Sequence, residues 1–147
     1  PQNSWASCAR AMAPAPPDPQ AVFGVPAEDI VWGWGGAGER PRRYVFLDAV
    51  AARGGCWVYS DGAASRLVTG VPDASPTLVL TQGWNLIGVP WPARLPLGLP
   101  LSRAWNWDAT EQVYQDLKAD EFLQPGRAYW IWSAEDVLLD LVRVISE

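Results

Sequence analysis

Pairs of carboxylates are the groups in this sequence with the most direct potential for chemistry. Two suitably spaced acids can act as a general acid and a base, or can hold a cation. The nearest pairs are Asp108 with Glu111, and Asp116 with Asp120 or Glu121. All of them fall in expected turns or on polar strand faces, and neither pair has a counterpart in the other half of the chain. We therefore interpret them as surface acids and predict neither a catalytic pair nor a metal site.

Other catalytic side chains are scarce. The chain contains no histidine, which excludes Ser-His-Asp and Cys-His catalysis and histidine metal sites. Two distant cysteines, Cys8 and Cys56, cannot form a cysteine-type zinc site by themselves. The glycine-rich stretch 33–38 lacks the lysine of a phosphate-binding loop. The sequence thus predicts a protein that is not an enzyme and needs no cofactor.

Tryptophan is the remaining resource, with ten residues in a chain of 147. Each ring can bury roughly 150–250 Å², so these rings can either fill a core or form a binding face. We expect Trp57, Trp84 and Trp130, in the most apolar strands, to be core residues. The candidates for exposure, and for stacking on a ligand such as a sugar ring, are Trp34, Tyr59, Trp91, Trp107 and Trp132. The alternative is that these rings also serve only as core filler.

Charge and hydropathy limit the possible partners and compartments. The chain has 16 acidic and 11 basic residues, a net charge of −5, and a hydrophobic fraction of 49%. The hydrophobic fraction predicts a packed core. The negative net charge would repel a phosphate polyanion, so we expect no nucleic-acid binding. No run of about 18 apolar residues is present, so we expect no transmembrane segment.

An internal repeat supplies the elements that must position the aromatic rings. The motif Trp32-Gly33-Trp34 recurs as Trp105-Asn106-Trp107, and the segment 56–60 recurs as 129–133. The offset is 73 residues in both cases. Ser4–Ala9 is a weaker echo of 83–88, at an offset of 79, because a proline-rich insert follows it. Landmarks in the same order at nearly constant spacing indicate two diverged copies of one unit.

Each unit is predicted to be β-structure. The aromatic residues of Trp32/Trp34, Trp57/Tyr59 and Trp130/Trp132 lie two apart, so each pair shares one face of an extended strand. We predict an all-β fold of two tandem antiparallel units, residues 1–72 and 73–147, packed together as a sandwich or partly open barrel. Strand 77–81 could belong to the second unit or close the first. The expected strands are 5–10, 29–34, 43–48, 55–60, 64–69, 77–81, 84–89, 103–107, 112–117, 127–133 and 136–143.

The alignment places the two cysteines opposite apolar residues of the second unit. Cys8 matches Ile87, and Cys56 matches Tyr129. A cysteine pair replacing an apolar contact predicts a Cys8–Cys56 disulfide, which would contribute roughly 3–4 kcal/mol of stability. Two free thiols are the alternative. A disulfide would place the protein in an oxidising compartment, that is, extracellular, periplasmic or on the cell surface.

The second unit resembles a known module of secreted bacterial proteins. The similarity lies in Gly83-Trp84-Asn85-Leu86-Ile87-Gly88, Trp105-x-Trp107, and Pro125-Gly126-Arg127-Ala128-Tyr129-Trp130-Ile131. The first unit keeps the Trp-x-Trp motif and the Trp57 strand but lacks the Asn-Leu-Ile-Gly and Pro-Gly segments. The resemblance implies a modular extracellular β protein with no assigned active site. We therefore expect a non-catalytic structural or protein-interaction module that contacts other subunits or neighbouring domains, the alternative being a module that binds polysaccharide.

Overall fold

The protein is built almost entirely of antiparallel β-strands. The computed structural model describes residues 4–24, 31–35, 42–60, 67–73, 75–96, 100–118 and 121–144. Over these ranges it contains β-strands and one helix of five residues, α1 (Pro19–Phe23). The predicted all-β class is thereby confirmed, and the sheets are open rather than closed into a barrel.

The first half of the chain forms a four-stranded antiparallel sheet. Its order is β1 (Ser4–Ala9), β5 (Gly55–Ser60), β3 (Val31–Gly35) and β4 (Arg43–Phe46). Alternation along these strands places aromatic side chains next to one another across the sheet. Trp5 lies opposite Tyr59, and Trp34 lies opposite Tyr44.

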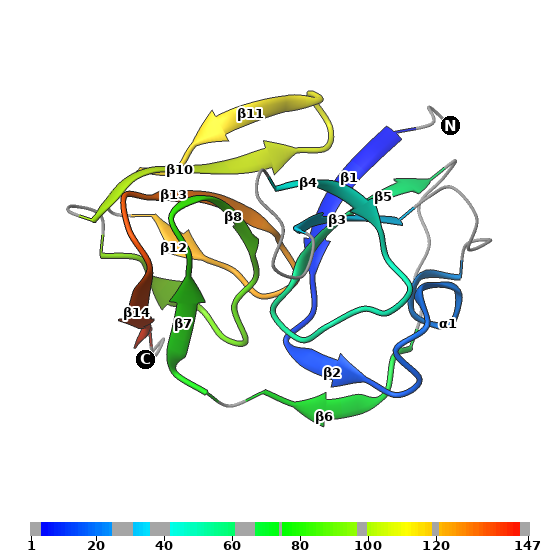
Figure 1. Ribbon diagram of the computed structural model, residues 1–147. Helices are drawn as coiled ribbons and strands as arrows, with labels where there is room; N and C mark the ends of the chain where they lie inside the picture. The colour runs from blue at the N-terminus through cyan, green and yellow to red at the C-terminus, as the bar shows by residue number, and fades with distance from the viewer. Residues whose placement is uncertain are drawn as a thin grey trace.

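The second half forms a sheet with the same strand order. It consists of β8 (Gly83–Ile87), β13 (Tyr129–Ser133), β10 (Leu101–Asp108) and β11 (Val113–Asp116). Its register follows that of the first sheet, since Trp84 lies opposite Trp132 and Trp107 lies opposite Tyr114. Strands matched by the sequence alignment therefore occupy the same places in the two sheets, which lie side by side (Figure 1).

Short strands complete each half. The pair β2 (Met12–Pro14) and β6 (Gly70–Pro72) forms a ribbon below the first sheet (Figure 1). In the second half β7 (Thr77–Leu80) pairs with β14 (Val137–Asp140), and β9 (Ala93–Arg94) pairs with β12 (Phe122–Leu123) and β15 (Val142–Arg143). Strand β7 thus belongs to the second unit and does not close the first. The expected strand 64–69 is absent over 67–69, and 64–66 lie outside the described residues.

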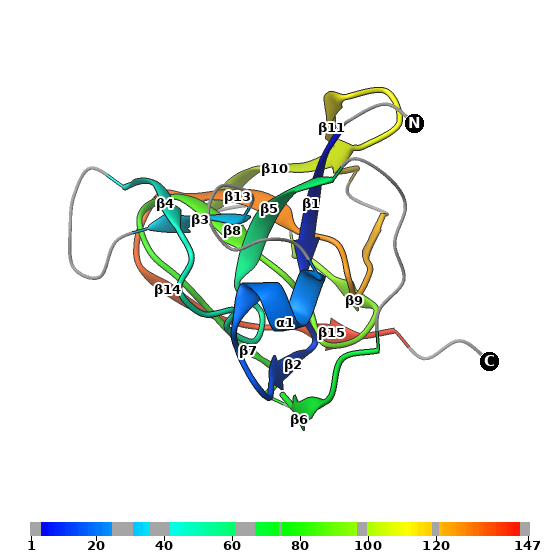
Figure 2. The same ribbon diagram turned by 90° about the vertical axis from the view of Figure 1, so that its right-hand side faces the viewer.

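Helix α1 lies in the proline-rich insert, where no helix was expected. The side chain of Asp18 caps it by accepting a hydrogen bond from the Ala21 N–H at 2.8 Å, and Pro19 occupies the first turn. Gly24 ends it in the left-handed conformation at φ 73°. An acidic N-cap, a first-turn proline and a C-terminal glycine are helix signals present in the sequence. The helix covers the side of the first sheet away from the second unit (Figures 1 and 2).

Three groups of buried side chains form the core. The largest lies within the second unit around Leu80, Leu123 and Ile131, and a small one lies within the first unit around Val31 and Val58. The third is rich in tryptophan and draws from both units. Its members are Ala9, Trp57, Leu86, Ala128 and Trp130, with Trp5, Trp32, Trp34, Trp84, Trp105 and Trp107 packed against them. The two units are therefore joined by aromatic packing.

The predicted disulfide is wrong. Cys8 and Cys56 do lie directly opposite each other on β1 and β5, but both are free thiols. Their sulfur atoms are 3.2 Å apart, well beyond the S–S bond length of roughly 2.05 Å. They pack with Val31, Val58, Phe23 and Leu47, as buried free cysteines commonly do. The cysteines therefore give no support to the prediction of an oxidising compartment.

Candidate binding site between the two units

Tryptophan side chains join the two units through reciprocal hydrogen bonds. The indole N–H of Trp34 donates to the carbonyl oxygen of Trp84 at 2.9 Å. The indole N–H of Trp107 donates to the carbonyl oxygen of Trp5, also at 2.9 Å. Because Trp34 matches Trp107 and Trp84 matches Trp5, the two bonds are equivalent. Such a reciprocal pattern is that of an approximate two-fold axis between the units.

The backbones repeat this reciprocity close to the axis. The N–H of Ala9 donates to Gly126 O at 3.2 Å, and the N–H of Gly88 donates to Arg53 O at 2.7 Å. Both acceptors have left-handed backbones, with φ of 88° at Gly126 and 62° at Arg53. A Cβ atom at Gly88 would lie 2.1 Å from the Cβ of Ala9, so only glycine fits there. The units approach as closely as their backbones allow.

Aromatic rings form two equivalent corners above this contact. In one corner the rings of Trp57, Trp107 and Tyr114 meet at interplanar angles of 70–82°, with centroids 4.9–6.1 Å apart. In the other corner Trp130, Trp34 and Tyr44 meet at angles of 72–89° over the same range of distances. Each corner takes rings from both units. Near-perpendicular contacts of this kind are favourable between aromatic quadrupoles.

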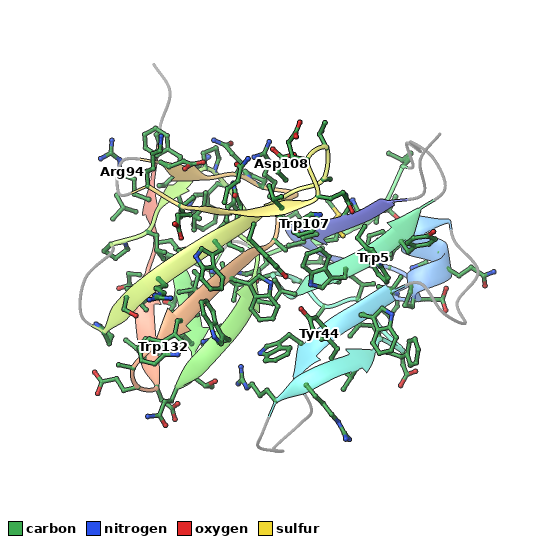
Figure 3. The ribbon with its side chains drawn as sticks, turned by 90° about the horizontal axis from the view of Figure 1, so that it is seen from above. Trp5, Tyr44, Arg94, Trp107, Asp108 and Trp132 are labelled. Atoms are coloured by element: carbon green, nitrogen blue, oxygen red, sulfur yellow. The ribbon has the colours of Figure 1, made fainter. Side chains whose placement is uncertain are left out.

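Two pockets open beside these corners. The larger pocket has a volume of about 590 Å³, and its lining is Trp5, Trp32, Tyr44, Trp57, Trp107, Gln112 and Tyr114. The smaller pocket has a volume of about 210 Å³, and its lining is Trp34, Tyr44, Trp84, Trp105, Tyr114 and Trp130. Six of the seven residues of the larger pocket match, through the alignment, the six that line the smaller one. In Figure 3, Trp5, Tyr44 and Trp107 lie over the junction of the two sheets.

The residue at the rim distinguishes the two pockets. At the larger pocket the Gln112 amide donates to Trp5 O at 3.0 Å. At the matching position of the first unit, the guanidinium of Arg42 donates to Trp84 O at 3.4 Å and to Asn85 Oδ1 at 3.2 Å. Arg42 does not itself line the smaller pocket, but Trp84 does. A neutral amide at one pocket is thus replaced by a cation near the other. The two pockets share a geometry but differ in charge.

Tyr44 and Tyr114 line both pockets and expose 44% and 47% of their surface. Burial, and after it the neighbouring Tyr114 hydroxyl, raises the pKa of Tyr44 to about 12. The Trp57 indole N–H lowers this pKa slightly, although no hydrogen bond of normal geometry joins it to Tyr44. The Tyr44 phenol therefore stays neutral at ordinary pH.

The predicted ligand-binding residues are divided by the structure. Trp34 and Trp107 line the pockets, although both are half-buried and hydrogen-bonded across the axis. The ring of Tyr59 packs beside that of Trp5, with centroids 5.2 Å apart, and Tyr59 lines neither pocket. Half-buried Trp132 and Trp91 line neither pocket, and Trp132 lies away from the junction (Figure 3). Trp91 packs on the second unit's core under the guanidinium of Arg143.

The prediction missed several lining residues, namely Trp5, Trp32, Tyr44, Tyr114 and Gln112. A signal for them existed in the alignment. Trp5 matches Trp84, and Tyr44 matches Tyr114, so both units keep an aromatic residue at positions on neighbouring strands. Of the three tryptophans expected in the core, Trp57 and Trp130 are buried, whereas Trp84 is half-buried. The indole N–H groups of Trp57 and Trp130 have no hydrogen-bond partner in the described part of the chain.

The carboxylates serve local structure. Asp108 accepts hydrogen bonds from the backbone N–H groups of Thr110 and Glu111, and these bonds lower the pKa of its carboxyl. Asp116 accepts from the Trp105 indole, and Asp120 lies outside the described residues. Among the residues described, no group of three or more acidic, cysteine or histidine side chains could hold a metal ion. Within the same ranges no helix has the length and apolar character to cross a membrane.

No protein-family model matches the chain, and comparisons with curated proteins and with solved structures also gave no match.

Proposed function

We propose that this chain is a non-catalytic interaction module of a secreted or envelope-associated bacterial protein, and that it binds a protein segment in the larger pocket. The partner would be another subunit or a neighbouring domain. The observation that carries the proposal is the pocket itself, an open site of about 590 Å³ lined by six aromatic rings and one amide. The compartment rests on the resemblance of the second unit to modules of extracellular proteins.

The chemistry of the lining favours an apolar protein segment. A sugar presents many hydroxyl groups that need hydrogen-bond partners, and unpaired polar groups are costly at a binding site. The Gln112 amide nitrogen already donates to Trp5 O and to Ala109 O, at 3.0 and 2.6 Å. Aromatic-lined grooves are the usual receptors for proline-rich segments, whose extended form is already ordered before binding. A proline-containing segment is therefore the ligand that suits the pocket best.

Carbohydrate binding is the second candidate. The half-exposed rings of Tyr44 and Tyr114 lie at the opening of the site and could stack on the apolar face of a pyranose. Such binding would depend on ring faces more than on hydrogen bonds. It predicts a response to polysaccharides and none to peptides.

Tryptophan fluorescence can decide between the two ligands, because four of the six rings that line the larger pocket are indoles. We expect quenching or a spectral shift with proline-rich peptides, and no response across a panel of soluble polysaccharides. Tyr114→Ala should remove the response. Val113→Ala is the matched control, since Val113 is equally exposed at 47% but lies on the opposite face of β11. A response to polysaccharides alone, or one that Tyr114→Ala leaves intact, would refute the proposal.

A further inference from the structure

We propose that the larger pocket receives a basic side chain, an arginine or lysine, of the bound protein segment. This inference rests on the proposed function and names the group that the site selects. It follows from the arrangement of the rings, from the charges at the rim, and from the contrast with the smaller pocket.

The rings line the pocket in several orientations. Trp57, Trp107 and Tyr114 form a corner of nearly perpendicular planes, and Trp5, Trp32 and Tyr44 complete the lining. The face of an aromatic ring carries negative charge density, and a cation within about 6 Å of its centroid is attracted to it. An alkylammonium or guanidinium group entering such a corner meets more than one ring face. A neutral apolar side chain would gain only the packing.

The charges around the larger pocket also favour a cation. None of the described residues in its lining is charged. The β10–β11 turn that carries Gln112 to the rim also carries two acids, Asp108 and Glu111. The chain as a whole has a net charge of −5, which increases the encounter rate with a basic partner.

The smaller pocket provides an internal comparison. The guanidinium of Arg42 is held beside it by bonds to Trp84 O and Asn85 Oδ1, where the larger pocket has the Gln112 amide. A second cation would be repelled there, and the volume of about 210 Å³ leaves less room. The same aromatic frame thus predicts one cation-binding pocket in the chain.

Two peptides that differ only in charge test the inference. The probes are a proline-rich peptide with a central arginine and the same peptide with citrulline, the neutral isostere of arginine. We expect the arginine peptide to bind roughly tenfold more tightly in a fluorescence titration. The preference should shrink with added salt, because Asp108 and Glu111 beside the β10–β11 turn contribute to it.

Gln112→Arg introduces at the larger pocket a guanidinium group like that of Arg42 in the first unit. It should weaken binding of the arginine peptide about tenfold and affect the citrulline peptide much less. Gln112→Glu is the matched variant, because it places a side chain of the opposite charge on the same left-handed backbone, with φ of 56°. It should keep the preference for the arginine peptide. Equal binding of both peptides, unchanged by Gln112→Arg, would overturn the cation inference and leave the proposed function standing. Failure of both peptides to bind would overturn both.

Discussion

Replacing Gly88 with alanine should force the two units apart. The new Cβ would lie 2.1 Å from the Cβ of Ala9, whereas ordinary contact begins at 3.4 Å. Neither methyl group is the end of a flexible side chain, so the strands must separate by roughly 1.3 Å. Overpacking of this kind costs about 1–3 kcal/mol, and stretching the 2.7 Å bond from Gly88 N–H to Arg53 O adds about 1 kcal/mol. We expect a loss of roughly 2–4 kcal/mol in the free energy of unfolding.

Urea unfolding followed by tryptophan fluorescence measures this loss. Moving the methyl group to the other side of the contact, in Ala9→Gly with Gly88→Ala, removes the clash while keeping the total volume. The double variant should recover most of the stability, apart from about 0.5–1 kcal/mol for a glycine within strand β1. The two substitutions should therefore show a favourable coupling of at least about 1 kcal/mol. Near-UV circular dichroism should report the same loss and recovery of tryptophan packing.

Gly54→Ala is the matched control for this experiment. A Cβ at Gly54 would make ordinary contacts at 3.6 and 3.7 Å with Ala51, so the substitution should change stability by less than about 0.5 kcal/mol. An unchanged unfolding midpoint for Gly88→Ala would refute the close approach of the two units. A double variant that loses the full sum of the single losses would refute it as well, because the methyl groups would then not meet.

Three further predictions concern single residues. Gly126→Ala should cost about 1 kcal/mol in urea unfolding from backbone strain alone, since its φ is 88° and a Cβ there would meet no atom within 4 Å. Tyr129→Phe should cost about 1 kcal/mol in the same assay, because the Tyr129 hydroxyl accepts a 2.7 Å hydrogen bond from the Gln124 N–H. For Tyr44, the pKa of about 12 means that the folded chain keeps a proton that the unfolded chain releases near pH 10. The contribution of Tyr44 to stability is thus present below pH 10 and lost as the pH rises through 12. Ultraviolet titration should find the Tyr44 phenol near pH 12, and Tyr114→Phe should lower the pKa of Tyr44.

Sequence periodicity located the strands well because it reports which side chains share a face. The internal repeat matched Trp34 with Trp107, and it brought Cys8 and Cys56 together on neighbouring strands, where they do lie opposite each other, although as free thiols. It could not tell what covers a face. The aromatic side chains of Trp34 and Trp107 lie on faces that point away from their own unit, which a single strand cannot distinguish from exposure to solvent. The other unit covers them, so rings expected to be exposed are half-buried and hydrogen-bonded.

The contacts at the axis and the two pockets place different demands on the sequence. At the axis each unit packs against the matching surface of the other, so equivalent residues make equivalent bonds. The indole hydrogen bonds of Trp34 and Trp107, for example, have the same length. The pockets face outward and are free of that constraint. There the residues differ. Gln112 lines the larger pocket, whereas its counterpart Arg42 bonds to the Trp84 carbonyl oxygen near the smaller one, and the two volumes differ almost threefold. The approximate symmetry is thus kept where the two units meet and broken at these two pockets.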